Sequence, residues 1–275
     1  MIPSYLSSER GDLERLSRQH CHAVRLNERF VICRVLGKYI LYADPDDVGL
    51  TPHLCLDGFW ESWVTIAMAR LLQPGWHCVD VGANHGYYTM IMADAVEPSG
   101  RVMAIEPNPQ LANLVKLSLE VNGYLPHASV LQRAAADLDS RKISLIVPRH
   151  RAMDATLFRE ATASDEVFEV ETITVDRATA DWRRVDLVKI DAEGAEELIW
   201  RGMRETLERH PAITIIMEMR CSRYAEPRAF VRDIQRAGFP LRHIDYDGSI
   251  KRVTAEQVLN DRLDEDWMLF LRRGD

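Results

Sequence analysis

The sequence lacks long apolar runs and paired cysteines. None of its hydrophobic stretches reaches the roughly 20 residues that a membrane-spanning helix needs. Its five cysteines are odd in number and scattered, without a C-x-x-C pair, which favours free thiols in a reducing compartment over disulfides or a zinc site. The N-terminus has neither a basic start nor an apolar segment of signal-peptide length. These absences predict a cytoplasmic protein without a membrane span.

Basic residues are also in short supply. Lys and Arg number 34 against 42 Asp and Glu, which gives a formal net charge of −8 at pH 7. Proteins that bind nucleic acid broadly need surplus cations to neutralise phosphates, so we expect no nucleic-acid partner. The 275 residues are 47% hydrophobic and 28% charged, as in an ordinary globular enzyme. This length suits one large domain with an extension.

Residues 1–57 predict an N-terminal extension built from a helix and a β-hairpin. The first 22 residues are polar, with apolar residues at helical spacing. Residues 30–43 form two apolar runs on either side of Gly37-Lys38, as in a hairpin. A single helix is predicted over residues 54–72. If the extension packs on a second copy of the chain, the protein would be a homodimer.

Residues 58–275 predict one catalytic domain in which strands and helices alternate. Short apolar strands are expected at residues 77–81, 101–105, 129–132, 185–190 and 213–217. Such alternation favours a mostly parallel sheet covered by helices on both faces. After residue 240, two strand-like segments have only a short helical stretch between them, which predicts an antiparallel pair at the sheet edge.

The turn after the first of these strands has the pattern Asp80-x-Gly82-x-Asn84-x-Gly86 and opens a helix. Gly82 permits close approach of a ligand to the backbone, and Asn84 tolerates a left-handed conformation. A dinucleotide fingerprint beginning at Gly82 would need glycines at positions 84 and 87, where the chain has Asn84 and Tyr87. The turn therefore favours S-adenosylmethionine, and a nucleotide-dependent oxidoreductase is the runner-up.

Glu106 ends the next strand, 20 residues beyond Gly86. An acidic residue at about this distance accepts hydrogen bonds from ribose hydroxyls. The alternative is a solvated carboxylate at a helix start, because Pro107-Asn108-Pro109 begins the next helix. Given the turn that precedes it, we favour ribose binding.

Several segments together resemble one known family. The most specific is Lys189-Ile190-Asp191-x-Glu193-Gly194-x-Glu196, and it is joined by residues 44–46, 58–61, 79–89, 104–108 and 213–218. Over roughly residues 40–220, this set resembles the FkbM family of methyltransferases. The resemblance implies a Rossmann-like class I methyltransferase fold, with a mostly parallel seven-stranded sheet, an antiparallel C-terminal edge hairpin and the N-terminal extension.

The resemblance also implies a cofactor, S-adenosyl-L-methionine, and a reaction. The methyl group would pass to a hydroxyl oxygen of a small acceptor such as a sugar, a glycoconjugate or a secondary metabolite. By position, the residues implied to hold the methionine part are Asp80, Gly82, Asn84 and Gly86. Glu106 would bind the ribose, and Asp137 the adenine amino group. The implied cofactor site is completed by Glu61, Pro107 and Asp191.

Three residues are candidates for the catalytic base. Asp191 ends the fourth strand, where ligands meet an open α/β sheet. A sugar hydroxyl is a poor acid, so a base at Asp191, Glu193 or His85 would help the transfer. Lys189 lies on the same side of its strand as Asp191 and could pair with a carboxylate. The alternatives are that His85 caps a helix and that Glu193 and Glu196 supply a favourable negative charge at a helix start.

Two further features of the site concern a possible metal ion and the charge of the acceptor. Asp191 and Glu193 could offer oxygen ligands to magnesium, but no third ligand is readable, so a metal-independent enzyme is predicted. Arginines in residues 149–151 and 220–224 would suit the phosphate of a nucleotide-activated sugar, although solvated loops explain them equally well. A protein that binds S-adenosylmethionine without catalysis is the rival from another functional class.

Overall fold

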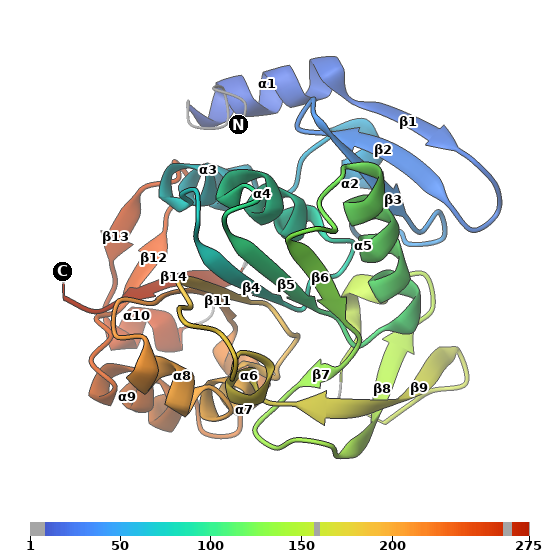
Figure 1. Cartoon of the computed structure of the whole chain (residues 1–275). Coiled ribbons are helices and arrows are strands. Elements are labelled where there is room, and N and C mark those ends of the chain that lie inside the picture. Colours follow the sequence, from blue (N-terminus) through green and yellow to red (C-terminus); the bar gives the residue numbers. More distant parts are fainter. Residues whose placement is uncertain (1–8, 157–159, 261–265, 275) are drawn as a thin grey trace.

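The computed structural model of the chain describes residues 9–156, 160–260 and 266–274. Its centre is an eight-stranded sheet with helices on both faces (Figure 1). The strands stand in the order β13-β12-β14-β11-β10-β4-β5-β6. Their bounds are β4 His77–Val81, β5 Arg101–Ile105, β6 Ala128–Leu131, β10 Leu187–Ile190, β11 Thr214–Met219, β12 Arg242–Ile244, β13 Ile250–Arg252 and β14 Trp267–Arg272.

The run from β11 to β6 is parallel throughout, and β14 is antiparallel to both of its neighbours. This arrangement confirms the predicted class I methyltransferase fold. The sheet has one strand more than the seven predicted. The extra strand, β13, is short and its side chains are exposed, so it carries no apolar alternation that would mark it in the sequence. It forms the edge hairpin with β12, while β14 inserts between β11 and β12.

Each face of the sheet buries its own apolar core. On one face Cys78 and Val102 pack with helices α3 and α4, and on the other Val79 and Val188 pack with α7, α8 and α9. The near-continuous apolar strands follow from burial on both faces. The helix bounds are α3 Ser62–Leu71, α4 Tyr87–Val96, α5 Pro109–Val121, α6 Val175–Ala178, α7 Glu196–Arg201, α8 Arg204–Arg209, α9 Pro227–Arg236 and α10 Ala255–Leu259, with 3₁₀ turns η2 Ala152–Asp154 and η3 Cys221–Arg223.

The N-terminal extension contains the predicted helix and hairpin. They are α1 Arg10–His20 and the pair β2 Val31–Val35 and β3 Tyr39–Ala43, to which a third strand, β1 His22–Arg25, is added. The extension packs on its own chain, since Lys38 Nζ and Tyr39 Oη donate to the buried Asp94 of α4 at 2.6 and 3.0 Å. The predicted division at residue 57 stays a prediction, because one apolar cluster contains residues from both sides of it.

The single helix predicted over residues 54–72 is wrong. The structure has α2 Thr51–Leu56 and then α3, with an irregular link between them. Gly58 and Glu61 adopt left-handed conformations at φ 71° and 35°, and the Gly58 carbonyl accepts a hydrogen bond from the backbone N–H of Leu36. This tertiary contact and these left-handed conformations interrupt the helix between Leu56 and Ser62. The link places Trp60 and Glu61 at the carboxyl ends of the central strands.

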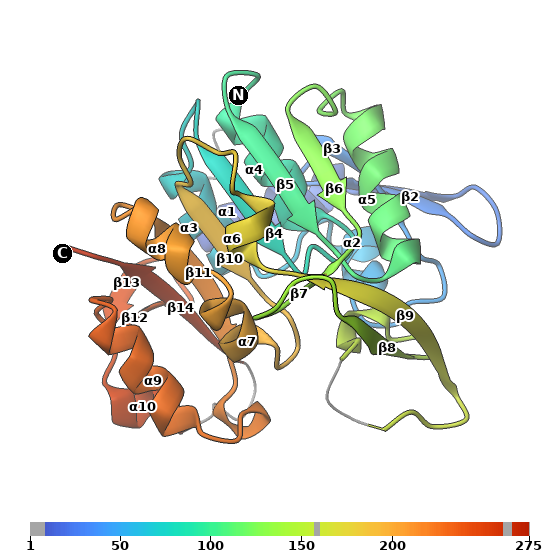
Figure 2. The same ribbon diagram turned by 60° about the horizontal axis from the view of Figure 1, so that its bottom comes forward.

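A second small sheet was not predicted. It contains β7 Ala134–Ala135, β8 Lys142–Pro148 and β9 Asp165–Ile173, in the order β7-β9-β8. Figure 2 shows it extending away from the central sheet beside α5. Residues 196–209 form two short helices, α7 and α8. Gly202 lies between them and approaches the Ala136 carbonyl so closely that a Cβ there would lie 2.0 Å from its oxygen.

Two further predictions concern whole-chain properties. All five cysteines lie among the described residues and none of them forms a disulfide, as predicted. Among the described residues, no helix combines the length and apolar character needed to cross a bilayer.

Candidate active site

The carboxyl ends of four parallel strands meet in one pocket. Its lining includes Gly82 after β4, Glu106 after β5, Asp191 after β10 and Glu218 within β11. Open α/β sheets bind ligands at this edge because consecutive loops diverge there. Strand order therefore gathers residues that lie up to 136 positions apart in the sequence, from 82 to 218.

The turn after β4 has the left-handed geometry that its sequence predicts. Gly82, Asn84 and Gly86 have φ angles of 72°, 52° and 83°. A Cβ on Gly82 would lie only 1.7 Å from the Asp191 carbonyl oxygen, and one on Gly86 would lie 3.0 Å from Val115. These glycines thus bring the turn against β10 and α5, and this close packing fixes the floor of the pocket.

Glu106 is a buried wall of the pocket rather than a solvated helix-start residue. Its side chain is 4% exposed and accepts hydrogen bonds from the backbone N–H groups of Asn84 at 2.7 Å and Asn108 at 2.9 Å. Burial raises the pKa of Glu106 to about 7, although these two backbone bonds oppose the shift. Asn108 caps α5 through Gln110, as its position before Pro109 predicts.

Asp80 and His85 lie behind the pocket and do not line it. Asp80 is fully buried and accepts a hydrogen bond from Thr89 Oγ1 at 2.6 Å, and burial raises its pKa. His85 is also fully buried, with Nε2 3.2 Å from the backbone N–H of Asp44 and Nδ1 2.6 Å from Asn84 Oδ1. Burial lowers the pKa of His85 and favours the neutral ring. This placement gives no support to contact between His85 and an acceptor.

Of the other residues predicted to bind the cofactor, three line the pocket and one does not. Glu61, Pro107 and Asp191 line the pocket. Asp137 does not, because the chain after β7 packs it against Gly202, where a Cβ would lie 3.2 Å from the Asp137 Cα. Ala134 occupies the corresponding stretch of pocket wall.

A buried lysine compensates the acidic strand ends. Lys189 is 1% exposed, and its Nζ lies 3.1 Å from Asp191 Oδ2, as the alternation along β10 predicts. The same ammonium group lies 4.7 Å from the centre of the Tyr88 ring, and Tyr88 donates to Glu61 Oε2 at 2.6 Å. Burial opposes the charge on Lys189, but Asp191, Asp80 and Glu61 outweigh this and raise its pKa.

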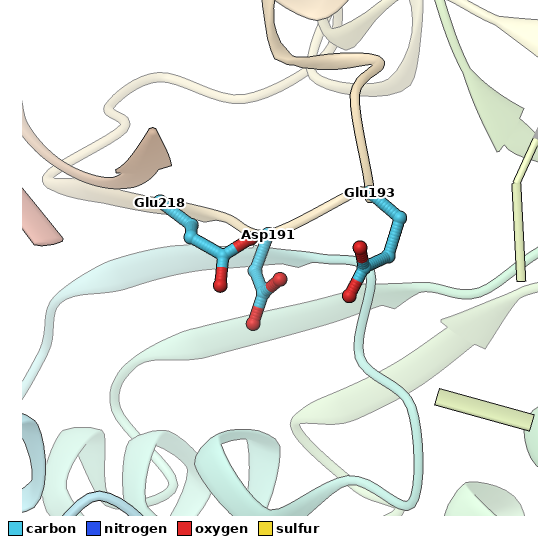
Figure 3. A group of neighbouring side chains, drawn as sticks. All are labelled: Asp191, Glu193 and Glu218. Atoms are coloured by element: carbon cyan, nitrogen blue, oxygen red, sulfur yellow. The ribbon is translucent and has the colours of Figure 1, made fainter. Parts of the chain in front are cut away.

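Three carboxylates lie together on the pocket wall. Figure 3 shows the side chains of Asp191, Glu193 and Glu218 extending to the same side of the strand ends. One carboxylate oxygen of each residue lies within 4.8 Å of the other two. Glu218 was not among the predicted site residues, although it ends the family-like segment 213–218. Such spacing would accept a divalent cation, but Lys189 and Arg223 already pair with this group. We assign no metal ion to it, and metal independence stays a prediction.

Arg223 links two of these carboxylates. Its Nη2 lies 2.8 Å from Glu193 Oε2 and its Nη1 lies 2.7 Å from Glu218 Oε2, while Asp266 is 3.2 Å from Nη2. Burial, with the charge of Asp191 added, raises the pKa of Glu193 to about 8 despite Arg223. Burial and the charges of Asp191 and Glu193 also raise the pKa of Glu218, well above its ordinary value.

Glu196 has a structural role beside this group. Its carboxylate accepts hydrogen bonds from the backbone N–H of Ala192 at 2.9 Å and of Gly194 at 3.1 Å, and from Tyr224 Oη at 2.7 Å. These bonds hold the loop in which Glu193 takes a left-handed φ of 48°. The predicted alternative for Glu196, a carboxylate that stabilises the start of α7, describes this arrangement.

A second hollow of about 560 Å³ adjoins the pocket at the strand ends, which is the candidate cofactor pocket. Its walls include Phe59, Trp63, Arg151 and Arg220, so both arginine-bearing segments singled out in the sequence reach it. The two hollows share five wall residues: Trp60, Glu61, Met153, Glu193 and Glu218. We call these five residues the boundary.

The Methyltransferase FkbM domain model matches residues 80–248, well over half of the chain. The protein belongs to this family. The match contains the strand ends that form the pocket, and S-adenosyl-L-methionine is the family's cofactor. Trp60 and Glu61 lie outside the matched range, so the boundary combines residues from inside and outside it.

Curated relatives match over short segments. The protein-L-isoaspartate O-methyltransferase of Aeropyrum pernix is 46% identical over 59 residues, which are 21% of this chain and 23% of that protein. The enzyme of the same name from Methanopyrus kandleri is 38% identical over 66 residues, 23% of this chain and 29% of that protein. This chain thus covers less than a third of either relative.

Solved structures are similar at low sequence identity. An S-adenosylmethionine-dependent O-methyltransferase from Thermotoga maritima is 14% identical with a TM-score of 0.43, covering 79% of this chain and 66% of that one.

Proposed function

We propose that this FkbM-family protein transfers the methyl group of S-adenosylmethionine to a hydroxyl oxygen of a small acceptor, such as a sugar, a glycoconjugate or a secondary metabolite. The observation that carries the proposal is the boundary, because three of its five residues are carboxylates and it lies between the cofactor pocket and a second hollow. A methyl group moving from one hollow to the other would pass these carboxylates.

The cofactor pocket has the chemistry that S-adenosylmethionine requires. Bound there, the cofactor supplies an electrophilic methyl group on a positively charged sulfur. Glu106 is placed to accept hydrogen bonds from the ribose hydroxyls, and Ile105 and Leu145 offer apolar walls for the adenine. Asp191 also lines the pocket, where its carboxylate would favour the positively charged sulfonium of the cofactor. The left-handed turn at Gly82 would let the backbone approach the methionine portion of the cofactor closely.

The second hollow suits a ring that carries hydroxyl groups. Trp60 and Trp63 offer indole surfaces against which the apolar face of a ring can pack. Arg220 and the boundary carboxylates offer donors and acceptors for hydroxyl groups.

His85 and Asp137 have no role in this proposal. The buried ring of His85 supports the loop at Asp44, and Asp137 lies outside the pocket. A small-molecule partner, a cytoplasmic location and the absence of a nucleic-acid partner stay predictions. The oxidoreductase alternative remains disfavoured by Asn84 and Tyr87, and a non-catalytic binding protein by the acidic boundary.

The test is calorimetric titration of the purified protein with S-adenosylmethionine, S-adenosylhomocysteine and NAD, followed by S-adenosylhomocysteine release with a panel of methyl glycosides and phenols. Binding of the first two ligands without NAD, and turnover with a hydroxylated compound, is the expected result. NAD binding alone would overturn the proposal. Cofactor binding without turnover across the panel would favour the non-catalytic alternative.

A further inference from the structure

Two boundary residues share one arginine. Glu193 and Glu218, which we call the glutamate pair, each bond to a different terminal nitrogen of Arg223 at 2.8 and 2.7 Å. Their side chains are 22% and 15% exposed, and Asp191 lies within the same 4.8 Å group. The pair is therefore close-spaced, largely withdrawn from water and open to both hollows.

One guanidinium cannot neutralise all the carboxylates that face it. Arg223 also contacts Asp266, and Asp191 adds a further negative charge. Two carboxyl groups at such a separation and burial do not both ionise readily. Glu218 is the less exposed of the pair, so it is the better place for a retained proton. Burial and neighbouring carboxylates raise the pKa of both residues, which agrees with a proton retained within the pair.

The other acidic groups near the boundary have partners of their own. Asp191 pairs with Lys189 and lines the cofactor pocket but not the second hollow. Glu61 accepts the hydrogen bond of Tyr88. Glu193 lies on both hollows and follows the end of β10, where the methyl group would cross.

We propose that Glu193 accepts the proton of the acceptor hydroxyl, that Glu218 keeps a proton of its own beside it, and that Arg223 is the positioning residue for both. The inference rests on the proposed function. The hydroxyl O–H bond breaks and its proton passes to Glu193, while an oxygen electron pair forms the new O–CH₃ bond. The S–CH₃ bond breaks and its electrons return to sulfur, leaving neutral S-adenosylhomocysteine.

The charged groups facing Glu193 determine how its role depends on pH. They come from its own loop and helix, from the segment around η2, from β11 and from the stretch around η3: Asp191, Glu196, Arg151, Asp154, Glu218 and Arg223. Because the base must be anionic, the rate of transfer should rise as pH increases through about 8.

The first experiment observes the protons directly. The intact protein, labelled with carbon-13 at the glutamate carboxyl carbons and saturated with S-adenosylhomocysteine, is titrated by NMR. The two signals are assigned by their loss in Glu193→Gln and Glu218→Gln. We expect the Glu193 signal to titrate near pH 8, and the proposal requires the Glu218 signal to be that of a protonated carboxyl group at pH 7. An ionised Glu218 at pH 7, or a Glu193 midpoint below pH 6, would overturn the proposal.

The second experiment separates the two glutamates by activity. Glutamine mimics a protonated glutamate, so Glu218→Gln should stay within about tenfold of the wild-type rate of methyl transfer to methyl glycosides. Glu193→Gln removes the base and should lose at least about 100-fold in kcat. Equal losses in the two variants, or full activity of Glu193→Gln, would contradict the assignment.

Arg223 is tested by the same titration. Arg223→Met should move the Glu193 midpoint upward, because the cation that opposes protonation is lost, and Arg223→Lys should restore part of the shift. Arg204→Met is the matched control, since Arg204 pairs with Asp233 on the surface and should leave the midpoint unchanged. An unshifted midpoint in Arg223→Met would remove its positioning role. Failure of the wild type to bind S-adenosylhomocysteine would instead count against the proposed function.

Discussion

Glu106 should make the stability of the protein depend on pH. Its carboxyl group is 4% exposed, and burial raises its pKa to about 7 from the ordinary value of 4.5. A carboxyl group with a raised folded-state pKa binds more protons when folded than when unfolded. Its contribution to stability is therefore complete below about pH 4.5 and is lost as pH rises through about 7.

Glu106→Gln should make the unfolding free energy less dependent on pH. Relative to the wild type, the variant should avoid a loss on the order of 3 kcal/mol between pH 4.5 and 8, as each unit of pKa difference corresponds to about 1.4 kcal/mol. Urea unfolding at several pH values measures this. Glu120→Gln, an exposed change on α5, is the control. Identical pH dependence in wild type and Glu106→Gln would show that Glu106 is ionised in the folded protein.

Gly82 should not tolerate any side chain. A Cβ there would overlap the Asp191 carbonyl oxygen, and the φ of 72° is strained for other residues. Gly82→Ala should cost roughly 3 kcal/mol or more and abolish S-adenosylmethionine binding, measured by urea unfolding and calorimetry. Gly123→Ala is matched in φ at 75° but has open space around it, so it should cost only about 1 kcal/mol and leave binding unchanged. Similar costs for both variants would contradict the close approach.

At the scale of elements, one buried carboxylate connects the N-terminal three-stranded sheet to helix α4. Asp94 of α4 is 7% exposed and accepts hydrogen bonds from Lys38, Tyr39 and Tyr124 at 2.6, 3.0 and 3.1 Å. The three donors come from the hairpin and from the loop after α5, so this carboxylate joins elements on both sides of residue 57.

Asp94→Asn should loosen the hairpin. The loss of charge weakens the bond to the partly exposed Lys38 and should cost about 2 kcal/mol in urea unfolding. Hydrogen exchange should also accelerate in β2 and β3. Asp181→Asn breaks an exposed pair with Arg101 and should cost less than about 1 kcal/mol. Unchanged exchange in β2 and β3 would show that apolar packing alone holds the extension.

At the scale of the whole molecule, the homodimer stays a prediction. The apolar face of α1 and the hairpin pack on the chain itself, since Leu13 and Tyr39 belong to the main core. What the extension leaves exposed is β1 and the loop beyond it, where Val24 is 60% and Leu26 51% exposed. Light scattering should give twice the 31.5 kDa mass of the chain if the prediction holds. A mass of one chain would exclude it at the concentration used.

The sequence by itself determined the fold class and the cofactor turn. The alternation of apolar strands and helices is a local pattern, and left-handed residues such as Gly82 and Asn84 follow from backbone sterics that act over a few positions. The Lys189–Asp191 pair could be predicted for the same reason, because alternate residues of a strand share a face.

Only the tertiary structure decided which side chains meet. His85 points into the protein because its ring bonds to the distant Asp44, and Asp137 lies outside the pocket because the backbone there packs against Gly202. Glu218 and Arg223 join Glu193 through the order of strands and the path of η3, which no local pattern encodes. The break between α2 and α3 brings Glu61 to the site for the same physical reason: contacts between remote segments override local helical preference.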